Sequence, residues 1–429
     1  METLIEFFTF EYPNIKYVVF GTILLSISSA VVGCFTFIKK KSLVGDVVSH
    51  AVLPGICISF LATGSKDPFL LIIGAFISGW ISIVVMDAII RNTKIKEDAA
   101  TGLSLSVFFG VGILLMTYIQ HTGNASQSGL DTFLFGKAAA LIGKDLLAFS
   151  IIAVAVLVTV FFFYKEFKLI SFDPHFAKVI GLPVRRLEMI LTSITVLAVV
   201  TGIQAVGVVL MAAMLITPAA AARFWTNRLH KMLIISSIFG AISGISGAYI
   251  SYATPSMPTG PWMVMILSII ALFSFFFAPG RGILISQWNR FKIQRQLLEE
   301  NLLKTFFKLG ESDEDFYRNI KADDLNLVRA FSPAQLKKGL RKLNGNGYII
   351  RTGDSWKLSK EGHEKGRRIT RLHRLWELYL TKYLRIAPDH VHEDADTIEH
   401  VITPELEARL EKLLEYPTTD PHQSNIPAR

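Results

Sequence analysis

An aspartate and a histidine stand four residues apart in the apolar run GDVVSHAVLPG at 45–55. On a helix, residues at this spacing share one face, so Asp46 and His50 would lie side by side. A carboxylate suits hard cations, and an imidazole suits manganese, iron and zinc, so the pair could bind a divalent cation transiently. Ionisable residues at membrane depth commonly mark an ion path. The alternative is a helix-end ion pair beside the basic loop at 39–41.

The other notable residues of the apolar stretches indicate less chemistry. Pro54 and Gly55 are expected to break or kink the span that carries the pair, and broken helices commonly border transport sites. Asp87 is better explained as a boundary residue at a helix end. Cys34 and Cys57 both lie in apolar segments and predict neither a disulfide framework nor a metal cluster.

The composition divides the chain into two parts. Of its 429 residues, 51% are hydrophobic and 18% are charged, with a mean hydropathy of +0.43, which argues against a disordered chain and an ordinary soluble enzyme. Residues 1–280 hold 18 Lys+Arg and 13 Asp+Glu, whereas the shorter remainder holds 26 and 22. The split predicts a membrane domain at 1–280, a linker at 281–294 and a water-soluble domain at 295–429.

Nine stretches are long and apolar enough to cross a bilayer as helices, which takes about 20 residues each. They are 17–38, 44–63, 68–90, 99–120, 145–164, 187–203, 205–222, 232–252 and 262–278. Alternate loops carry fourteen basic residues on one side against four on the other. The positive-inside rule then places the N-terminus outside and the C-terminus in the cytoplasm. We therefore expect an all-α, multi-pass domain in a bacterial plasma membrane.

The long cytoplasmic loop contains the run DPHFAKVIGLPVRR. Asp173 and the proline after it are expected to begin a short helix, which Gly181 would end. Ala177 is expected on the exposed turn, where a small residue would let a partner pack closely. The alternative is a plain basic connector. Further along, the small residues of 207–223 predict close helix packing in lipid.

The runs SLVGDVVSHAVLPGI, DPHFAKVIGLP and GVVLMAAMLITPAAAA occur in this order. Together they resemble the permease subunits of ATP-binding-cassette transporters for manganese, zinc or iron, over about residues 15–280. The resemblance implies a dimer of identical or related permeases, two separate ATPase subunits and an extracytoplasmic metal-binding protein. It also implies that Asp46 and His50 line the metal path and that 173–186 docks on the ATPase. The chain has no G-x-x-x-x-G-K-[ST] phosphate loop, so ATP hydrolysis is expected in a partner.

The soluble part contains AFSPAQLKKGLRKLNGNGYIIRTGDSWKLSKEG at 330–362. Ser332 would cap a helix with one apolar face, and a two-stranded hairpin around a Gly-Asp turn would follow. Helix followed by hairpin is the winged-helix pattern, whose helix can enter a DNA major groove. The candidate phosphate contacts are Lys337, Lys338, Arg341 and Lys342. Winged helices also bind proteins, and for a membrane-tethered chain we favour that role over nucleic acid.

The last part of the chain holds a second group of potential metal ligands. RITRLHRLWELYL at 368–380 predicts an amphipathic helix carrying His373. In the run HEDADTIEHVITPEL, Asp396, Glu399 and His400 fall at i, i+3 and i+4, on one face of a second helix. The alternative is a solvated acidic face without a ligand.

The region at about 295–422 resembles the metal-dependent repressors of the diphtheria-toxin-repressor class. That resemblance implies that His373, Asp396, Glu399 and His400 correspond to metal ligands. The class also draws ligands from its first helix, where this chain has Asn301 and Lys304. A lysine is a poor ligand at neutral pH, so the predicted site is only partly retained.

The sequence therefore predicts the permease subunit of an ATP-driven manganese, zinc or iron importer, fused to a winged-helix tail with a possible metal-sensing role. The chain itself is not expected to be an enzyme or to bind a permanent cofactor. The metal is the transported substrate and a possible ligand of the tail. Two alternatives are an ion-coupled secondary transporter and a membrane-anchored, metal-responsive DNA-binding regulator.

Overall fold

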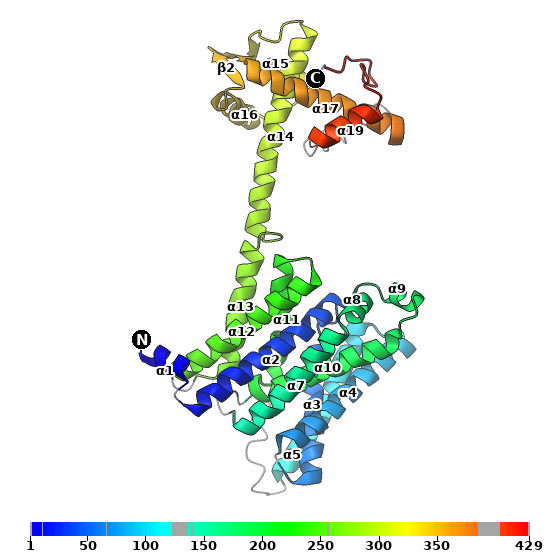
Figure 1. Cartoon of the computed structure of the whole chain (residues 1–429), viewed down its shortest axis with the longest axis vertical. Coiled ribbons are helices and arrows are strands. Elements are labelled where there is room, and N and C mark those ends of the chain that lie inside the picture. Colours follow the sequence, from blue (N-terminus) through cyan, green and yellow to red (C-terminus); the bar gives the residue numbers. More distant parts are fainter. Residues whose placement is uncertain are drawn as a thin grey trace. The chain divides into compact units, whose positions relative to one another are not determined.

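The computed structural model describes residues 2–10, 12–65, 67–121, 136, 138, 141–254, 257–384 and 404–427. The chain divides into two compact units, Met1–Ser286 and Gln287–Arg429. Figure 1 shows the helices and strands of both units. Each unit has its own core of buried apolar side chains.

The first unit is a bundle of apolar helices. Within the described residues, nine helices are long and apolar enough to cross a membrane, which confirms the prediction. They are α2 (Pro13–Ile38), α3 (Val44–Thr63), α4 (Pro68–Asn92), α5 (Glu97–His121), α7 (Gly143–Phe162), α10 (Val184–Val206), α11 (Val208–Trp225), α12 (Leu229–Ala253) and α13 (Thr259–Phe277). The short helices are α1 (Glu2–Thr9), α8 (Tyr164–Phe172) and α9 (Pro174–Val179). Helices suit hydrocarbon because they pair their backbone polar groups internally.

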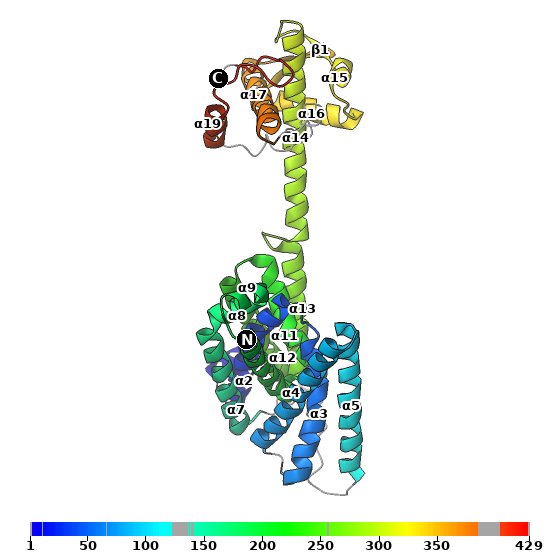
Figure 2. The same ribbon diagram turned by 90° about the vertical axis from the view of Figure 1, so that its right-hand side faces the viewer.

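Burial separates the interior helices of this unit from the peripheral ones. In α2, α3 and α10 most of the apolar span is buried, whereas α5 and α13 leave most of theirs exposed. Helix α2 lies alongside α12, α11 and α7, and α3 packs between α4 and α5 (Figures 1 and 2). The helix with the Asp46–His50 pair is therefore an interior element.

The gap between two expected spans lies three residues further along the chain than the sequence placed it. The spans 187–203 and 205–222 predicted a gap at residue 204, but α10 continues to Val206 and the chain turns at Gly207, whose φ of +94° suits glycine. Gly202 gives room to a neighbour, since an added Cβ would lie 2.1 Å from the Met211 sulfur. Of the break or kink expected at Pro54 and Gly55, the break does not occur, because α3 runs through both residues.

Glycines allow the backbones of neighbouring helices to touch. A Cβ added to Gly33 of α2 would lie 1.8 Å from the Leu215 carbonyl oxygen of α11. On α3 and α4, a Cβ at Gly55 would lie 2.1 Å from the Gly74 carbonyl oxygen, and one at Gly74 would lie 2.4 Å from that of Gly55. The prediction of close packing for 207–223 is confirmed by the Leu215 contact, and the same device joins α3 to α4.

The second unit is α+β. Its elements are α14 (Ile283–Ser312), β1 (Ile320–Lys321), α15 (Ala322–Val328), α16 (Pro333–Gly345), β2 (Ile349–Thr352), β3 (Ser355–Leu358), α17 (Lys360–Leu384) and α19 (Pro404–Leu413). Helix α14 occupies most of the expected linker at 281–294, because no glycine or proline interrupts the chain between Ile283 and Leu309.

The winged-helix prediction for this unit is confirmed. Ser332 caps α16 through a capping box with Gln335, and the buried leucines of α16 join the core that contains Leu302 of α14. The hairpin pairs Ile349 with Leu358, and β1 adds a third strand in the order β1-β3-β2. The sequence missed β1 because a two-residue strand has no periodicity to detect.

The Gly55–Gly74 contact predicts a position-specific sensitivity. We expect Gly55→Ala to lower the free energy of unfolding by about 1–3 kcal/mol, because the new methyl group would overlap the Gly74 carbonyl. Gly110→Ala on α5 is the matched control, since nothing lies within 4 Å of its added Cβ. Thermal unfolding in detergent measures both, and equal stability of the two variants would contradict the prediction.

Candidate functional site

The structure brings Asp46 and His50 together on α3. Asp46 lies in the first turn, and its Oδ1 is 3.6 Å from Nε2 of His50; the side chains are 41% and 21% exposed. This distance is longer than an ordinary hydrogen bond. It is close to the separation of about 3.4 Å expected between two ligands bound about 2.1 Å from one tetrahedral ion. The pair is therefore spaced to share a cation.

The surroundings of His50 leave part of its polar capacity unused. Its ring meets Phe109 of α5 edge to face, with centroids 5.0 Å apart, and its Nδ1 is buried without a hydrogen-bond partner in the described part of the chain. Pro54, four residues later, has no N–H to donate to the His50 carbonyl, as an ordinary residue of a helix would. The histidine thus retains capacity for further polar contacts.

Two lysines of the basic loop at 39–41 form ion pairs with residues other than Asp46. Lys39 binds Glu188 of α10 at 2.8 Å, and Lys41 lies 3.8 Å from Asp87 of α4. Asp87 also lies 3.7 Å from Arg91, as expected of a boundary residue at a helix end. These pairings weaken the alternative in which Asp46 serves only as the ionic partner of this loop.

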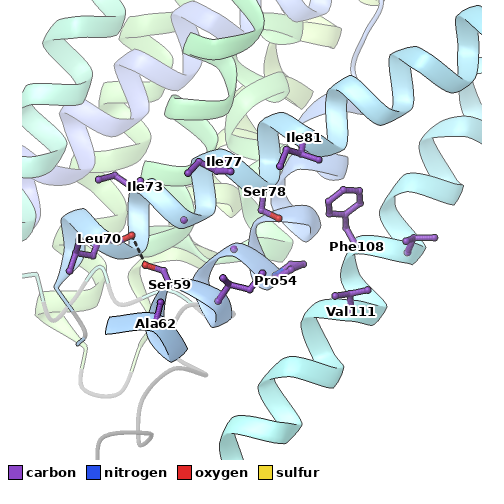
Figure 3. Close-up of a pocket in the computed structure, with 14 residues that line it drawn as sticks. Pro54, Ser59, Ala62, Leu70, Ile73, Ile77, Ser78, Ile81, Phe108 and Val111 are labelled. Atoms are coloured by element: carbon purple, nitrogen blue, oxygen red, sulfur yellow. Dashed lines mark hydrogen bonds between the residues drawn. The ribbon is translucent and has the colours of Figure 1, made fainter. Parts of the chain in front are cut away.

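A cavity of about 530 Å³ lies between α3, α4 and α5, beyond Pro54 (Figure 3). Its lining is apolar except for Ser59 and Ser78. The Ser59 hydroxyl donates to the Leu70 carbonyl at 2.8 Å, and the Ser78 hydroxyl donates to that of Ala51 at 2.6 Å. Both hydroxyls thus serve helix packing, and the lining contains no carboxylate, imidazole or thiol and neither Asp46 nor His50.

The expected helix of the long loop is present as α9, and its local chemistry agrees with the sequence. Oδ1 of Asp173 accepts a hydrogen bond from the Phe176 N–H at 2.9 Å, which caps the helix. Gly181 follows the helix with a φ of +87°, a conformation that favours glycine.

The expected position of Ala177 on the exposed turn was wrong. Ala177 is fully buried, whereas Phe176, Val179 and Ile180 are 52%, 83% and 52% exposed. The capping pattern predicts the helix but not its rotation, because six residues are too few to define an apolar face. The outward surface of α9 therefore carries these three apolar side chains beside the exposed His175 and Lys178, and the three apolar residues are the ones that sequence reasoning missed.

The structure describes one of the four predicted metal ligands of the tail. His373 of α17 is 3% exposed; its Nδ1 lies 2.8 Å from Nζ of Lys304, and its Nε2 lies 2.6 Å from Oε1 of Glu377. The other three, Asp396, Glu399 and His400, lie outside the described residues.

The first-helix positions do not fit a ligand role. Oδ1 of Asn301 accepts a hydrogen bond from Arg329 at 3.0 Å, and an ammonium such as that of Lys304 has no lone pair. Where the structure describes the chain, no three His, Cys, Asp or Glu side chains gather in a way that could hold a metal ion. Of the predicted tail site the structure describes His373 and the first-helix positions Asn301 and Lys304, and these three residues do not form a metal site by themselves.

The predicted phosphate contacts of α16 differ in their surroundings. Lys337, Lys338 and Arg341 are exposed. Lys342 is exposed as well, and it also forms an ion pair with Glu299 of α14. All four predicted contacts thus lie at the surface.

Comparison with known proteins places this chain in a family. The ABC 3 transport family matches residues 11–278, and the iron dependent repressor, metal binding and dimerisation domain matches 359–428. The first match spans more than half of the chain, and the chain belongs to the ABC 3 transport family.

Individual relatives agree with this assignment. The chain is 40% identical over 387 residues to the manganese transport system membrane protein MntC of Bacillus subtilis, covering 90% of this chain and 88% of that protein. It is 43% identical over 300 residues to the zinc transport system membrane protein TroC of Treponema pallidum, covering 70% and 99%. The structure of PsaBC from Streptococcus pneumoniae in complex with Fab matches 66% of this chain and 99% of its own, with 33% identity and a TM-score of 0.59.

Proposed function

We propose that this chain is the membrane-spanning permease subunit of an ATP-driven importer of divalent metal ions. Family membership supports the transporter class, and the Asp46–His50 pair is the single observation that supports a metal ion as the substrate. Manganese and zinc are the first ions to test, because relatives are named for them, and iron is the third. A carboxylate with an imidazole accepts all three.

Two ligands suit transient binding of a transported ion better than its permanent retention. Asp46 and His50 supply two ligands, and a bound ion would complete its shell with water or with donors of another subunit. A second permease subunit, identical or related, would bring a second such pair and make four. Conduction requires binding that is favourable enough to admit the ion and weak enough to release it.

The outward face of α9 is the proposed docking surface for a separate ATPase subunit. With the N-terminus outside, α9 lies on the cytoplasmic side, as the basic loops indicate. The chain continues from α9 into α10, where Glu188 binds Lys39 at the end of α2. Helix α3, which carries the Asp46–His50 pair, follows α2 after the loop at 39–43. Helix α9 is therefore connected to the pair through α10, the Glu188–Lys39 ion pair and this loop.

The partners and alternatives follow from this assignment. The ATPase subunits would hydrolyse ATP, an extracytoplasmic protein would deliver the metal, and this chain would perform no covalent chemistry. The family match favours this function over an ion-coupled secondary transporter.

Measurements of metal uptake test whether Asp46 and His50 lie on the ion path. We expect Asp46→Asn and His50→Ala each to reduce uptake of radiolabelled Mn²⁺ or Zn²⁺ into vesicles by at least about 10- to 100-fold, since each removes a ligand or its charge. Asp87→Asn is the matched control, because its carboxylate lies next to Lys41 and Arg91 and is not one of the two proposed ligands. The complexes must stay assembled. Uptake at the wild-type rate by either path variant would contradict the assignment.

Coupling tests α9. Val179→Asp places a charge on its most exposed apolar residue, so we expect loss of transport and of metal-stimulated ATP hydrolysis, with weaker retention of the ATPase subunit on purification. Leu327→Asp is the control, because Leu327 of α15 is 86% exposed and lies in the other unit. Unchanged stimulation in Val179→Asp would argue against docking at this surface.

A further inference from the structure

Three charged or polar side chains form a buried chain between α14 and α17. Lys304, His373 and Glu377 are 5%, 3% and 2% exposed. Nζ of Lys304 lies 2.8 Å from one ring nitrogen of His373, and the other ring nitrogen lies 2.6 Å from the Glu377 carboxylate. The imidazole thus connects a cation on one helix to an anion on its own helix.

Hydrogen-bond chemistry fixes the direction of this chain. An ammonium only donates, so Nδ1 of His373 must accept from Lys304. In the neutral imidazole the proton then lies on Nε2, which donates to Glu377. The single lone pair through which a neutral His373 could bind a metal is therefore directed at the Lys304 ammonium.

Two arginines of α17 also form ion pairs with carboxylates of the second unit. Arg374 binds Glu311 of α14 at 2.9 and 2.6 Å and lies 3.5 Å from Asp420. Burial lowers the pKa of the Arg374 guanidinium, but the hydrogen bond and charge of Glu311, with the nearby acids, outweigh it and raise the pKa above its ordinary value. Arg371 likewise forms an ion pair with Glu411.

The open space beside this junction is lined by side chains of both charges. A cavity of about 590 Å³ has His373, Glu377, Glu311 and Asp420 at its wall, together with Lys308 and Arg374. Arg374 already forms ion pairs with Glu311 and Asp420, so the protein itself supplies the positive charge beside these two carboxylates. A metal ion at Nδ1 would in addition have to displace the Lys304 ammonium from its buried position.

We propose that the Lys304 ammonium takes the place of a metal ion in the tail, so that an internal cation joins α14 to α17 at every metal concentration. The tail is then a metal-independent module of the permease. It does not sense the transported ion through His373. This inference concerns the second unit alone and does not depend on which ion the permease transports.

Hydrogen exchange read by mass spectrometry tests this proposal on the full-length chain in detergent, because peptides report on α14 and α17 separately from the membrane helices. Wild type, Lys304→Met, Lys304→Glu and the exposed control Lys337→Met are each compared in chelator, in Mn²⁺ and in Zn²⁺. A ligand at 100 times its Kd that binds only the folded state slows exchange through unfolding by up to about 100-fold.

We expect wild type and Lys337→Met to exchange at the same rates with and without metal. Lys304→Met should exchange faster in both helices, because His373 and Glu377 lose their cation. Lys304→Glu should also exchange faster in chelator and should recover protection in Mn²⁺ or Zn²⁺, since it places a carboxylate beside the imidazole.

Two results would overturn the proposal. One is metal-dependent protection of the wild-type tail that His373→Ala removes, which would instead support the four-ligand site predicted from the sequence. The other is hydrogen exchange at the wild-type rate in Lys304→Met, which would show that the ammonium has no structural role. If Lys304→Glu does not fold, the wild-type metal comparison and Lys304→Met decide the question. Loss of transport in other variants has no bearing on these readouts.

Discussion

The contact between the backbones of α3 and α4 at Gly55 and Gly74 is the constraint on which the candidate path depends. Lipid tails are as apolar as leucine side chains, so helices in a membrane associate through close packing and not through the hydrophobic effect. A contact with no side chain between the two backbones fixes both their separation and their register. Nine residues, or about 13 Å of helix, separate Gly55 from Asp46. The position of the pair thus follows from packing more than two turns away.

The membrane helices and the winged helix could be predicted because their signals are local. Apolar length identifies a span without any knowledge of its neighbours, and the cap at Ser332 with the turn at Gly353 brackets a helix and a hairpin in sequence. The Asp46–His50 pair was predictable for the same reason, since its geometry depends on one helix. A resemblance covering most of the chain added the transporter class.

The errors concern features that a single segment does not determine. Whether Ala177 or Val179 faces outward depends on which side of α9 the rest of the unit covers. Gly202 has the residue type of a helix breaker, but it serves the approach of Met211 while Gly207 makes the turn. The Lys304–His373 contact joins residues 69 positions apart, and only the packing of α14 on α17 reveals it. Local patterns identify the candidates for such contacts and leave the partners open.

The two histidines at the candidate metal sites differ in the way the protein satisfies them. His373 has a cation at one ring nitrogen and a carboxylate at the other, so its buried polar atoms contribute to folding. His50 has a carboxylate 3.6 Å from one nitrogen and no partner at the other in the described structure.

A cation held between Asp46 and His50 would bind Nε2, which is too far from Asp46 for an ordinary hydrogen bond, whereas a cation at His373 would have to break contacts that already exist. On these proposals the same residue type serves transport in one unit and cohesion in the other, and the difference lies in whether the fold already supplies the positive charge.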